Sequence, residues 1–297
     1  MRLSQVRDFV AIADAGSITA AARVLGVSQP GLTKSIGALE SELHVSLFQR
    51  SARGVSLTKF GRAFYARARA AHSELEKARN DVLQLAGGRS GRVAIGFGPV
   101  AAALVVPSAV LKFQALFPEV EVRLLEGFAH VVMPLVRDQT LDMALAPKLP
   151  GYRRDAALKF RPLFHNEQII VGRAGHPRAA SRSIGEFADA RWLSFEPRPV
   201  VDQVLSGIGL AGAHQLMQCE SLNVMLAMLA NSSMLAIASR RILTLPVARG
   251  VLQEIPIAER IPPMTTGLYV VADTPLTTPA AAMAKLLVES GRMLTMP

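Results

Sequence analysis

Cysteine is almost absent from this 297-residue chain, because Cys219 is the only one. No disulfide can therefore form within the chain, and a reducing compartment is expected. Long apolar runs are missing too, since no window approaches the roughly 18 uncharged apolar residues that a membrane helix needs. The N-terminus has no long apolar segment, because Arg7 and Asp8 interrupt it. We expect a cytoplasmic protein that has no membrane partner and is not exported.

Acidic residues are absent between Glu42 and Glu74, in a chain of net charge +10 and pI about 10.4. The basic residues of that segment are Arg50, Arg53, Lys59, Arg62, Arg67 and Arg69. A run of one charge is often only a solvated surface. Its place directly after a two-helix pattern, described below, favours contact with phosphate groups.

Patterns typical of enzymes and metal sites are also missing. The six histidines (44, 72, 130, 165, 176 and 214) lack metal-ligand spacing, and one cysteine cannot build a zinc cluster. Cys219 has no nearby base, which favours a buried core thiol over a redox or nucleophilic role. We expect no metal, no cofactor and no enzymatic activity.

One motif could mislead, because residues 207–212 spell the G-x-G-x-x-G pattern of dinucleotide-binding folds. That pattern needs a preceding strand, a following helix and an acidic residue about 20 positions later. Here helical spacing precedes it, an extended run follows, and no acidic residue lies near position 230. We interpret it as a loop that ends a helix.

The strongest pattern that is present spans residues 17–43, where two short helices meet at Gly26. Their apolar inner face comprises Ala21, Ala22, Leu25, Val27, Leu32, Ile36, Leu39 and Leu43. Ser28 can cap the second helix, with Pro30 in its first turn. The residues left to point outward are Gln29, Pro30, Thr33, Lys34 and Gly37. This pattern predicts a helix–turn–helix that binds DNA, and the alternative is an ordinary helical hairpin.

Further elements surround this pair. Residues 4–15 form a first helix, and residues 47–50 and 55–57 are extended runs around a basic turn. They predict a small hairpin, or wing, whose arginine can enter the minor groove of DNA.

A long helix follows, capped by Thr58 and ending at Gly87-Gly88. Its apolar residues alternate steps of four and three, in the order Phe64, Ala68, Ala71, Leu75, Ala78, Val82 and Leu85. Such a heptad seam predicts a coiled-coil pairing helix and hence a dimer. The alternative is a helix packed on its own domain.

Beyond a hinge-like linker at residues 87–91, strands and helices alternate. We expect strands at 93–97, 120–125, 141–146, two within 160–173, and at 192–195, 216–220, 234–238 and 269–272. We expect helices at 101–117, 131–137, 200–207, 222–230 and 277–293. This alternation predicts an α/β domain with largely parallel sheets.

The chain resembles the LysR-type transcriptional regulators of bacteria over its whole length. The residues that carry the resemblance are Phe9, Gly16, Ser17, Ala20, Ala21, Ala22, Leu25, Ser28, Gln29, Pro30, Leu39, Glu40, Leu43, Leu47, Phe48, Gln49, Arg50, Leu57, Thr58 and Gly61. The resemblance implies a winged helix-turn-helix domain at 1–58, a linker and dimerisation helix with its hinge at 59–90, and an effector-binding domain at 91–297. That last domain would be an α/β fold like periplasmic binding proteins, with two Rossmann-like lobes. Lobe I would take about 92–163 and 268–297, and lobe II about 164–267.

In function, the resemblance implies a sequence-specific DNA-binding transcriptional regulator controlled by a small-molecule effector bound between the two lobes. Its partners would be a double-stranded DNA operator, the effector, RNA polymerase, and further copies of itself as a homodimer or a tetramer built from two dimers. One departure from the family concerns residues 98–101, which carry no hydroxyl where many members have one. A simple carboxylate effector is therefore less expected.

The expected DNA contacts are Ser17, Thr19, Ser28, Gln29, Pro30, Thr33, Lys34, Arg50 and Arg53. Gln29 suits an adenine edge, Thr33 a thymine methyl group, and Lys34 a guanine edge or a phosphate. The hydroxyl groups and helix N-termini would hold phosphates, and the two arginines would anchor the wing.

The expected effector contacts are Phe97, Pro99, Val100, Gly127, Phe128, Ala146, Pro147, Phe195, Pro197, Ser221 and Asn223. Each could instead be a core or turn residue. Together they predict a largely apolar cleft for an aromatic or partly apolar ligand. Two other functions stay open, namely a constitutive or architectural DNA-binding protein and an enzyme on a binding-protein-like scaffold.

Overall fold

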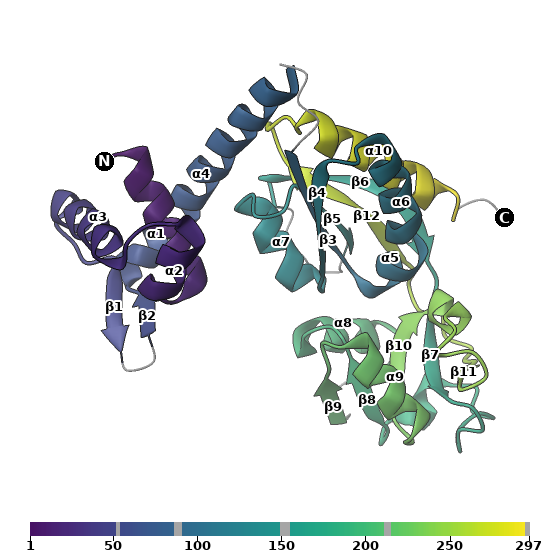
Figure 1. Ribbon diagram of the computed structural model, residues 1–297. Coiled ribbons are helices and arrows are strands. Elements are labelled where there is room, and N and C mark those ends of the chain that lie inside the picture. The colour runs from purple at the N-terminus through teal and green to yellow at the C-terminus, as the bar shows by residue number, and fades with distance from the viewer. Residues whose placement is uncertain (52–53, 86–90, 149–154, 211–214, 295–297) are drawn as a thin grey trace. The chain divides into compact units, whose positions relative to one another are not determined.

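The computed structural model describes residues 1–51, 54–85, 91–148, 155–210 and 215–294. The chain divides into two compact units (Figure 1). The first comprises Met1–Ser90 together with Asp138–Thr140, and the second comprises Gly91–Arg137 and Leu141–Pro297. No helix of the described ranges is long and apolar enough to cross a membrane.

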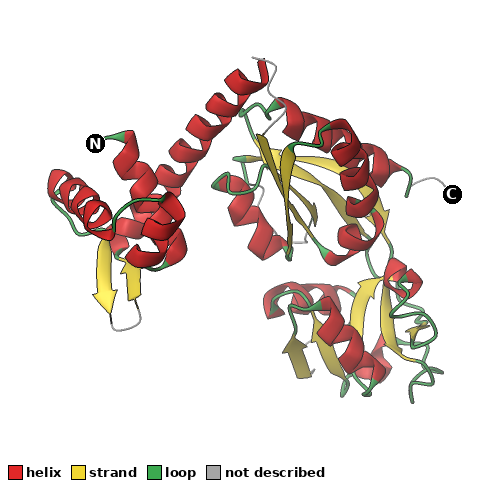
Figure 2. Cartoon of the chain, in the orientation of Figure 1, coloured by secondary structure: helices red, strands yellow, loops and turns green. Residues whose placement is uncertain are grey.

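The first unit contains four helices and one hairpin among its described residues (Figure 2). Its elements are α1 (Leu3–Ala15), α2 (Ile18–Leu25), α3 (Gln29–Leu43), β1 (Phe48–Ser51), β2 (Gly54–Leu57) and α4 (Lys59–Leu85). Its core surrounds Phe9, which is fully buried. The Phe9 ring centroid lies 5.1 Å from that of Phe48 and 5.0 Å from that of Phe64. The three elements that carry these rings, α1, β1 and α4, are thereby packed together.

The turns of this unit follow the residues at its helix ends. Gly16 and Gly26 have φ values of 60° and 66° after α1 and α2, a conformation that glycine adopts without strain. Most of the predicted inner face is buried or half-buried, but Val27 and Leu43 are 40% and 36% exposed. Val27 lies in the turn between α2 and α3, and Leu43 ends α3 where the chain turns away at His44, so neither reaches the core.

The second unit contains two five-stranded sheets. The first has the order β4-β3-β5-β12-β6, with β3 (Gly91–Phe97), β4 (Val120–Glu126), β5 (Met143–Pro147), β6 (Leu158–Asn166) and β12 (Met264–Val271). The second has the order β11-β7-β10-β8-β9, with β7 (Gln168–Arg173), β8 (Arg191–Ser194), β9 (Gln215–Gln218), β10 (Leu235–Ser239) and β11 (Leu252–Ile255). The first sheet contains β6 as far as Asn166 and β12 from Met264, so it extends past the expected lobe limits at 163 and 268.

The expectation of largely parallel sheets is wrong, because both sheets are mixed. Strands joined by helices are parallel, as in the pairs β3–β4, β3–β5, β8–β9 and β8–β10. The pairs that involve β6, β7, β11 and β12 are antiparallel. These strands lie next to the two points at which the chain crosses between the sheets, where no helical crossover sets a parallel direction.

The helices of this unit cover both faces of each sheet. They are α5 (Pro99–Leu104), α6 (Val106–Leu116), α7 (Ala129–Arg137), α8 (Arg198–Gly207), α9 (Leu222–Ala230) and α10 (Thr278–Arg292), with short 3-10 turns η1 (Ile184–Phe187) and η2 (Arg240–Thr244). Helices α5, α6 and α10 pack on one face of the first sheet and α7 on the other (Figure 1). In the second sheet, α9 and α8 take opposite faces.

The single helix expected at 101–117 is two helices. The chain breaks at Val105, and α6 restarts with Pro107 in its first turn. Proline has no N–H to donate to the carbonyl group four residues earlier, so a continuous helix is disfavoured there.

Candidate functional sites

The outer face of α3 is the first candidate site. Pro30, Thr33, Lys34 and Gly37 follow helical spacing along one side, and Gln29 opens the helix. All five are exposed except Thr33, which is half-buried, while Leu32, Ile36 and Leu39 fill the core behind them. The face combines an amide, a hydroxyl and an ammonium group, which can bind base edges and phosphates.

Two helix N-termini lie beside this face. The Ser17 hydroxyl accepts a hydrogen bond from the Ala20 amide at 3.3 Å, and the Ser28 hydroxyl accepts one from the Gly31 amide at 3.2 Å. The Thr19 hydroxyl donates to the Gln29 side-chain oxygen at 3.4 Å, which joins the start of α2 to the start of α3. These expected contact residues therefore lie close together.

The wing is attached to α3 by a residue to which the sequence assigned no role. The Glu40 carboxylate accepts hydrogen bonds from the amides of Leu47 and Phe48, at 2.6 and 3.0 Å. An acidic residue followed by an apolar hairpin carries little local signal, so its role was missed. Of the expected wing contacts, Arg50 belongs to β1, but its side chain and all of Arg53 lie outside the described part of the chain.

Helix α4 carries the expected heptad seam in two parts. Phe64 and Ala68 pack into the core around Phe9, as the alternative of a helix packed on its own domain required. Farther along, Ala71, Leu75, Ala78 and Val82 are exposed. Leu85 ends the helix, and its side chain lies outside the described residues.

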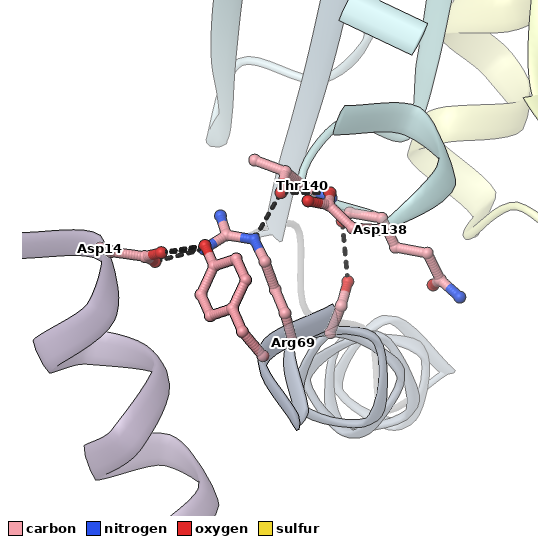
Figure 3. Close-up of polar contacts among 7 residues, drawn as sticks. Asp14, Arg69, Asp138 and Thr140 are labelled. Atoms are coloured by element: carbon pink, nitrogen blue, oxygen red, sulfur yellow. Dashed lines mark hydrogen bonds and ion pairs between the residues drawn. The ribbon is translucent and has the colours of Figure 1, made fainter. Parts of the chain in front are cut away.

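A polar cluster links α1 to α4 (Figure 3). The Arg69 guanidinium forms an ion pair with Asp14 and donates to the Tyr65 hydroxyl at 2.8 Å and to the Thr140 hydroxyl. Tyr65 in turn donates to Asp14. Burial, reinforced by the bond to Asp14, raises the pKa of Tyr65 to about 12. The phenol therefore stays protonated and acts as a hydrogen-bond donor between the two helices.

The second candidate site is a cavity of about 120 Å³ between the two sheets of the second unit. Apolar side chains from both sheets form most of its wall. The expected effector contacts that line it are Pro99, Val100, Phe128, Pro147 and Phe195.

The other expected contacts lie elsewhere. Phe97 and Ala146 are buried in the core of the first sheet, and Gly127 packs against α7. Pro197 and Ser221 precede α8 and α9, the latter accepting a bond from the Val224 amide at 3.4 Å, and Asn223 is exposed on α9.

Three buried polar side chains at the crossings line the cavity as well. Asn166 donates to the Thr266 hydroxyl at 2.7 Å and accepts from the Ser239 hydroxyl at 3.2 Å. They join β6, β12 and β10 where the chain passes between the sheets. Sequence reasoning missed all three, although a polar residue that ends an apolar strand was an available signal for Asn166 and Ser239.

Several polar side chains meet where the two sheets face each other. His130 shares a hydrogen bond with Glu220 at 3.2 Å, and the Phe128 ring stacks on both Phe195 and His130. The Glu196 Oε2 atom is buried and has no hydrogen-bond partner among the described residues. Burial raises the pKa of the Glu196 carboxyl group, and the charge of His130 opposes that shift.

The glycine motif at residues 207–212 and Cys219 remain to be placed. Gly207 ends α8 and Gly209 has a φ of 95°, which agrees with a helix-ending loop, while residues 211–214 lie outside the description. Cys219 is half-buried and contacts the Ser221 carbonyl oxygen at 3.4 Å. In the described ranges, no group of three His, Cys, Asp or Glu side chains could hold a metal ion.

Comparison with protein families gives two matches. Residues 3–62 match the bacterial regulatory helix-turn-helix protein of the lysR family, and residues 86–292 match the LysR substrate binding domain. The chain belongs to the LysR family. It is therefore a member of a family of DNA-binding transcriptional regulators that carry a substrate-binding domain, and the resemblance found in the sequence is confirmed.

Relatives of this LysR-type chain include the HTH-type transcriptional regulator PcaQ of Agrobacterium fabrum, 28% identical over 98% of this chain and 95% of PcaQ. The SDS degradation transcriptional activation protein of a Pseudomonas species is 31% identical over 80% of this chain and 78% of its own length.

Solved structures share the fold of this LysR-type chain. A full-length OxyR variant from Pseudomonas aeruginosa matches with a TM-score of 0.73 and 24% identity, over 99% of this chain and 95% of OxyR. CbnR, a LysR family transcriptional regulator, matches with a TM-score of 0.66 and 17% identity, over 98% of this chain and 99% of CbnR. The predicted winged helix-turn-helix, linker helix and two-lobed α/β domain are thereby confirmed.

Proposed function

We propose that this protein binds a specific DNA sequence through α3 and that a small molecule in the cavity between the two lobes controls this binding. The observation that carries the DNA proposal is the exposed outer face of α3, together with the serine-capped N-termini of α2 and α3. Gln29 and Thr33 would contact base edges, and Lys34 a guanine or a phosphate. CbnR, with the same fold, has been solved in complex with its target DNA, which supports DNA binding by this chain.

The test of the DNA interface is the salt dependence of binding. Lys34→Ala and Arg53→Ala should each weaken binding and reduce the salt slope by about one, because each removes one phosphate contact. Lys112→Ala is the matched control, since this exposed lysine lies on α6 in the other unit. An unchanged salt slope for both variants would contradict the assignment of Lys34 and Arg53 as phosphate contacts.

Pairing through α4 is part of the same proposal. Ala71, Leu75, Ala78 and Val82 are exposed and continue the heptad spacing beyond the domain core. A second copy would bury this stripe, and paired recognition helices would meet paired half-sites. Leu75→Glu should shift the protein toward monomer in sedimentation experiments, with Glu74→Gln as the control on the same turn. Assembly into tetramers and contact with RNA polymerase stay predictions.

Control by a small molecule has its support in the cavity, whose apolar wall comes from both sheets. A ligand that contacts both lobes can change the balance between two arrangements of the lobes. The size of that change is limited by the difference in the ligand's affinity for the two arrangements. A thermal-shift screen of metabolites, followed by DNA titration with each hit, tests this. If compounds bind but never change DNA affinity, the protein is a constitutive DNA-binding protein instead.

A further inference from the structure

The cavity between the lobes adjoins a second one. The second cavity, of about 270 Å³, is lined by residues of α8, β8 and the return crossing. Side chains common to both walls are Gln168, Ser194, Glu196, Ile237 and Met264. The Glu196 side chain therefore lies at the boundary between two spaces.

The Glu196 carboxyl group is poorly satisfied in this position. Its Oε2 atom has no hydrogen-bond partner among the described residues, and the nearby Ser194 hydroxyl accepts a hydrogen bond from the Glu196 backbone amide at 2.9 Å. A buried carboxyl oxygen without a donor is costly, and such a group needs an explanation. A donor supplied by a ligand would satisfy it.

Several other polar groups of the first cavity already have hydrogen-bond partners. Asn166, Ser239 and Thr266 bond one another, and the Arg241 Nη2 atom donates to the Leu294 carbonyl oxygen at 2.7 Å. At the start of α5, Pro99 has no N–H group, and residues 98–101 offer no hydroxyl. A ligand carboxylate would thus find no hydroxyl donor at the start of α5.

The size and lining of the first cavity limit the rest of the ligand. An engineered cavity of about 150 Å³ binds benzene, so the space beside Phe128 and Phe195 suits a single ring. The two phenyl rings offer flat apolar surfaces on which such a ring can pack.

We propose that the cleft takes a compact, ring-sized apolar ligand with one N–H donor group, and that the Glu196 carboxylate binds this group. An ammonium or amidinium group fits best, because it supplies N–H donors together with a positive charge that attracts the Glu196 carboxylate. This inference rests on the proposed function, since it assumes that the cleft takes a small molecule.

Calorimetric titration of the full-length protein with benzylamine, benzyl alcohol and benzoate tests the inference. Benzylamine should bind more tightly than benzoate. Glu196→Gln keeps the shape of the side chain but removes its charge, so it should weaken benzylamine binding by about ten-fold or more. The affinity for benzyl alcohol should change by less than about two-fold, because a neutral hydroxyl can bond either side chain.

Glu289→Gln is the matched control, since Glu289 is exposed on α10 and does not line either cavity. It should leave benzylamine binding unchanged. Tighter binding of benzoate than of benzylamine, no binding of benzylamine, or equal benzylamine affinity in wild type and Glu196→Gln would overturn the inference. Binding of benzoate that also changed DNA affinity would overturn it while leaving the proposed function intact.

Discussion

Phe128 and Phe195 stack with their ring centroids 4.8 Å apart and their planes inclined by 25°. Phe128 precedes α7 beside the first sheet, and Phe195 follows β8 of the second, so the pair is a direct apolar contact between the lobes. Its strength bears on how easily the two lobes separate.

A double-mutant cycle on this aromatic pair should show coupling. Phe128→Ala and Phe195→Ala should each lower the free energy of unfolding, and the double variant should lose less than their sum by about 0.5–1.5 kcal/mol. Chemical denaturation of the second unit measures this. Phe160 and Phe195 serve as an unpaired control, because Phe160 packs on Tyr269 instead. Additive losses at Phe128 and Phe195 would show that the stacking contributes nothing.

Two glycines of the DNA-binding unit should respond oppositely to alanine. A Cβ atom on Gly61 would lie 2.0 Å from the Leu47 carbonyl oxygen, whereas one on Gly37 would meet nothing within 4 Å. Gly61→Ala must therefore displace α4 from the wing and should unfold the unit at a lower temperature. Gly37→Ala, in the interior of α3, should stabilise it by roughly 0.5–1 kcal/mol.

DNA titration adds a second measurement to this glycine pair. Gly37 lies on the outer face of α3, so if that face meets DNA as far as Gly37, the more stable Gly37→Ala variant should bind its operator less tightly. Equal or stronger binding by this variant would place Gly37 away from the DNA surface.

His176 should make the second unit less stable in mild acid. Burial lowers the pKa of His176, and the charges of Arg173 and Arg178 add to this, against the bond to the Ser233 carbonyl oxygen. The neutral ring is satisfied at both nitrogens, since Nδ1 accepts from the Arg178 amide at 3.1 Å and Nε2 bonds Ser233 at 3.2 Å.

The sign of this pH effect follows from linkage. A lowered pKa in the folded state means that the unfolded chain binds a proton first as the pH falls through the ordinary value of 6.5. The melting temperature should therefore fall from about pH 7.5 to about pH 5.5, a range above the titration of ordinary carboxyl groups. His176→Gln should melt with less dependence on pH. An equal dependence in the variant would assign the effect to other groups.

The Tyr65 phenol should remain protonated in alkaline solution. At a pH of about 11, one unit above the ordinary tyrosine value, wild-type Tyr65 should stay neutral because its pKa is about 12. Asp14→Asn removes the acceptor charge and should bring the pKa of Tyr65 closer to the ordinary value. Tyrosine absorbance in a Tyr152→Phe, Tyr269→Phe background isolates this residue, with circular dichroism to verify folding. Identical ionisation in both proteins would contradict the assigned role of Asp14.

Sequence reasoning succeeded where the signal is local. The inner face of the helix–turn–helix, the serine caps and the glycine turns depend on residues within a few positions of each other, and periodicity reports them directly. It failed at Val27 and Leu43, because spacing alone does not show where a helix end leaves the core.

The cleft was harder to predict because its parts come from distant segments. Asn166 meets Thr266 across 100 positions and Ser239 across 73, and no local pattern marks such a pair. Some of the expected effector contacts lie on strands, where successive side chains point to opposite faces. Phe97 and Ala146 point into the core rather than into the cleft. Assignment of a residue to the cleft or the core needs the register of each strand.

The packing of Phe64 and Ala68 around Phe9 has a practical meaning for hybrid proteins. A DNA-binding fragment that stopped at residue 58, or at residue 62 where the family match ends, would lose both side chains and uncover the Phe9 ring. A junction for exchanging DNA-binding domains between relatives belongs after Arg69, which pairs with Asp14, and before α4 becomes exposed at Ala71. The DNA-binding domain that can be transferred as a folded unit is thus longer than the segment at residues 3–62 that matches the family.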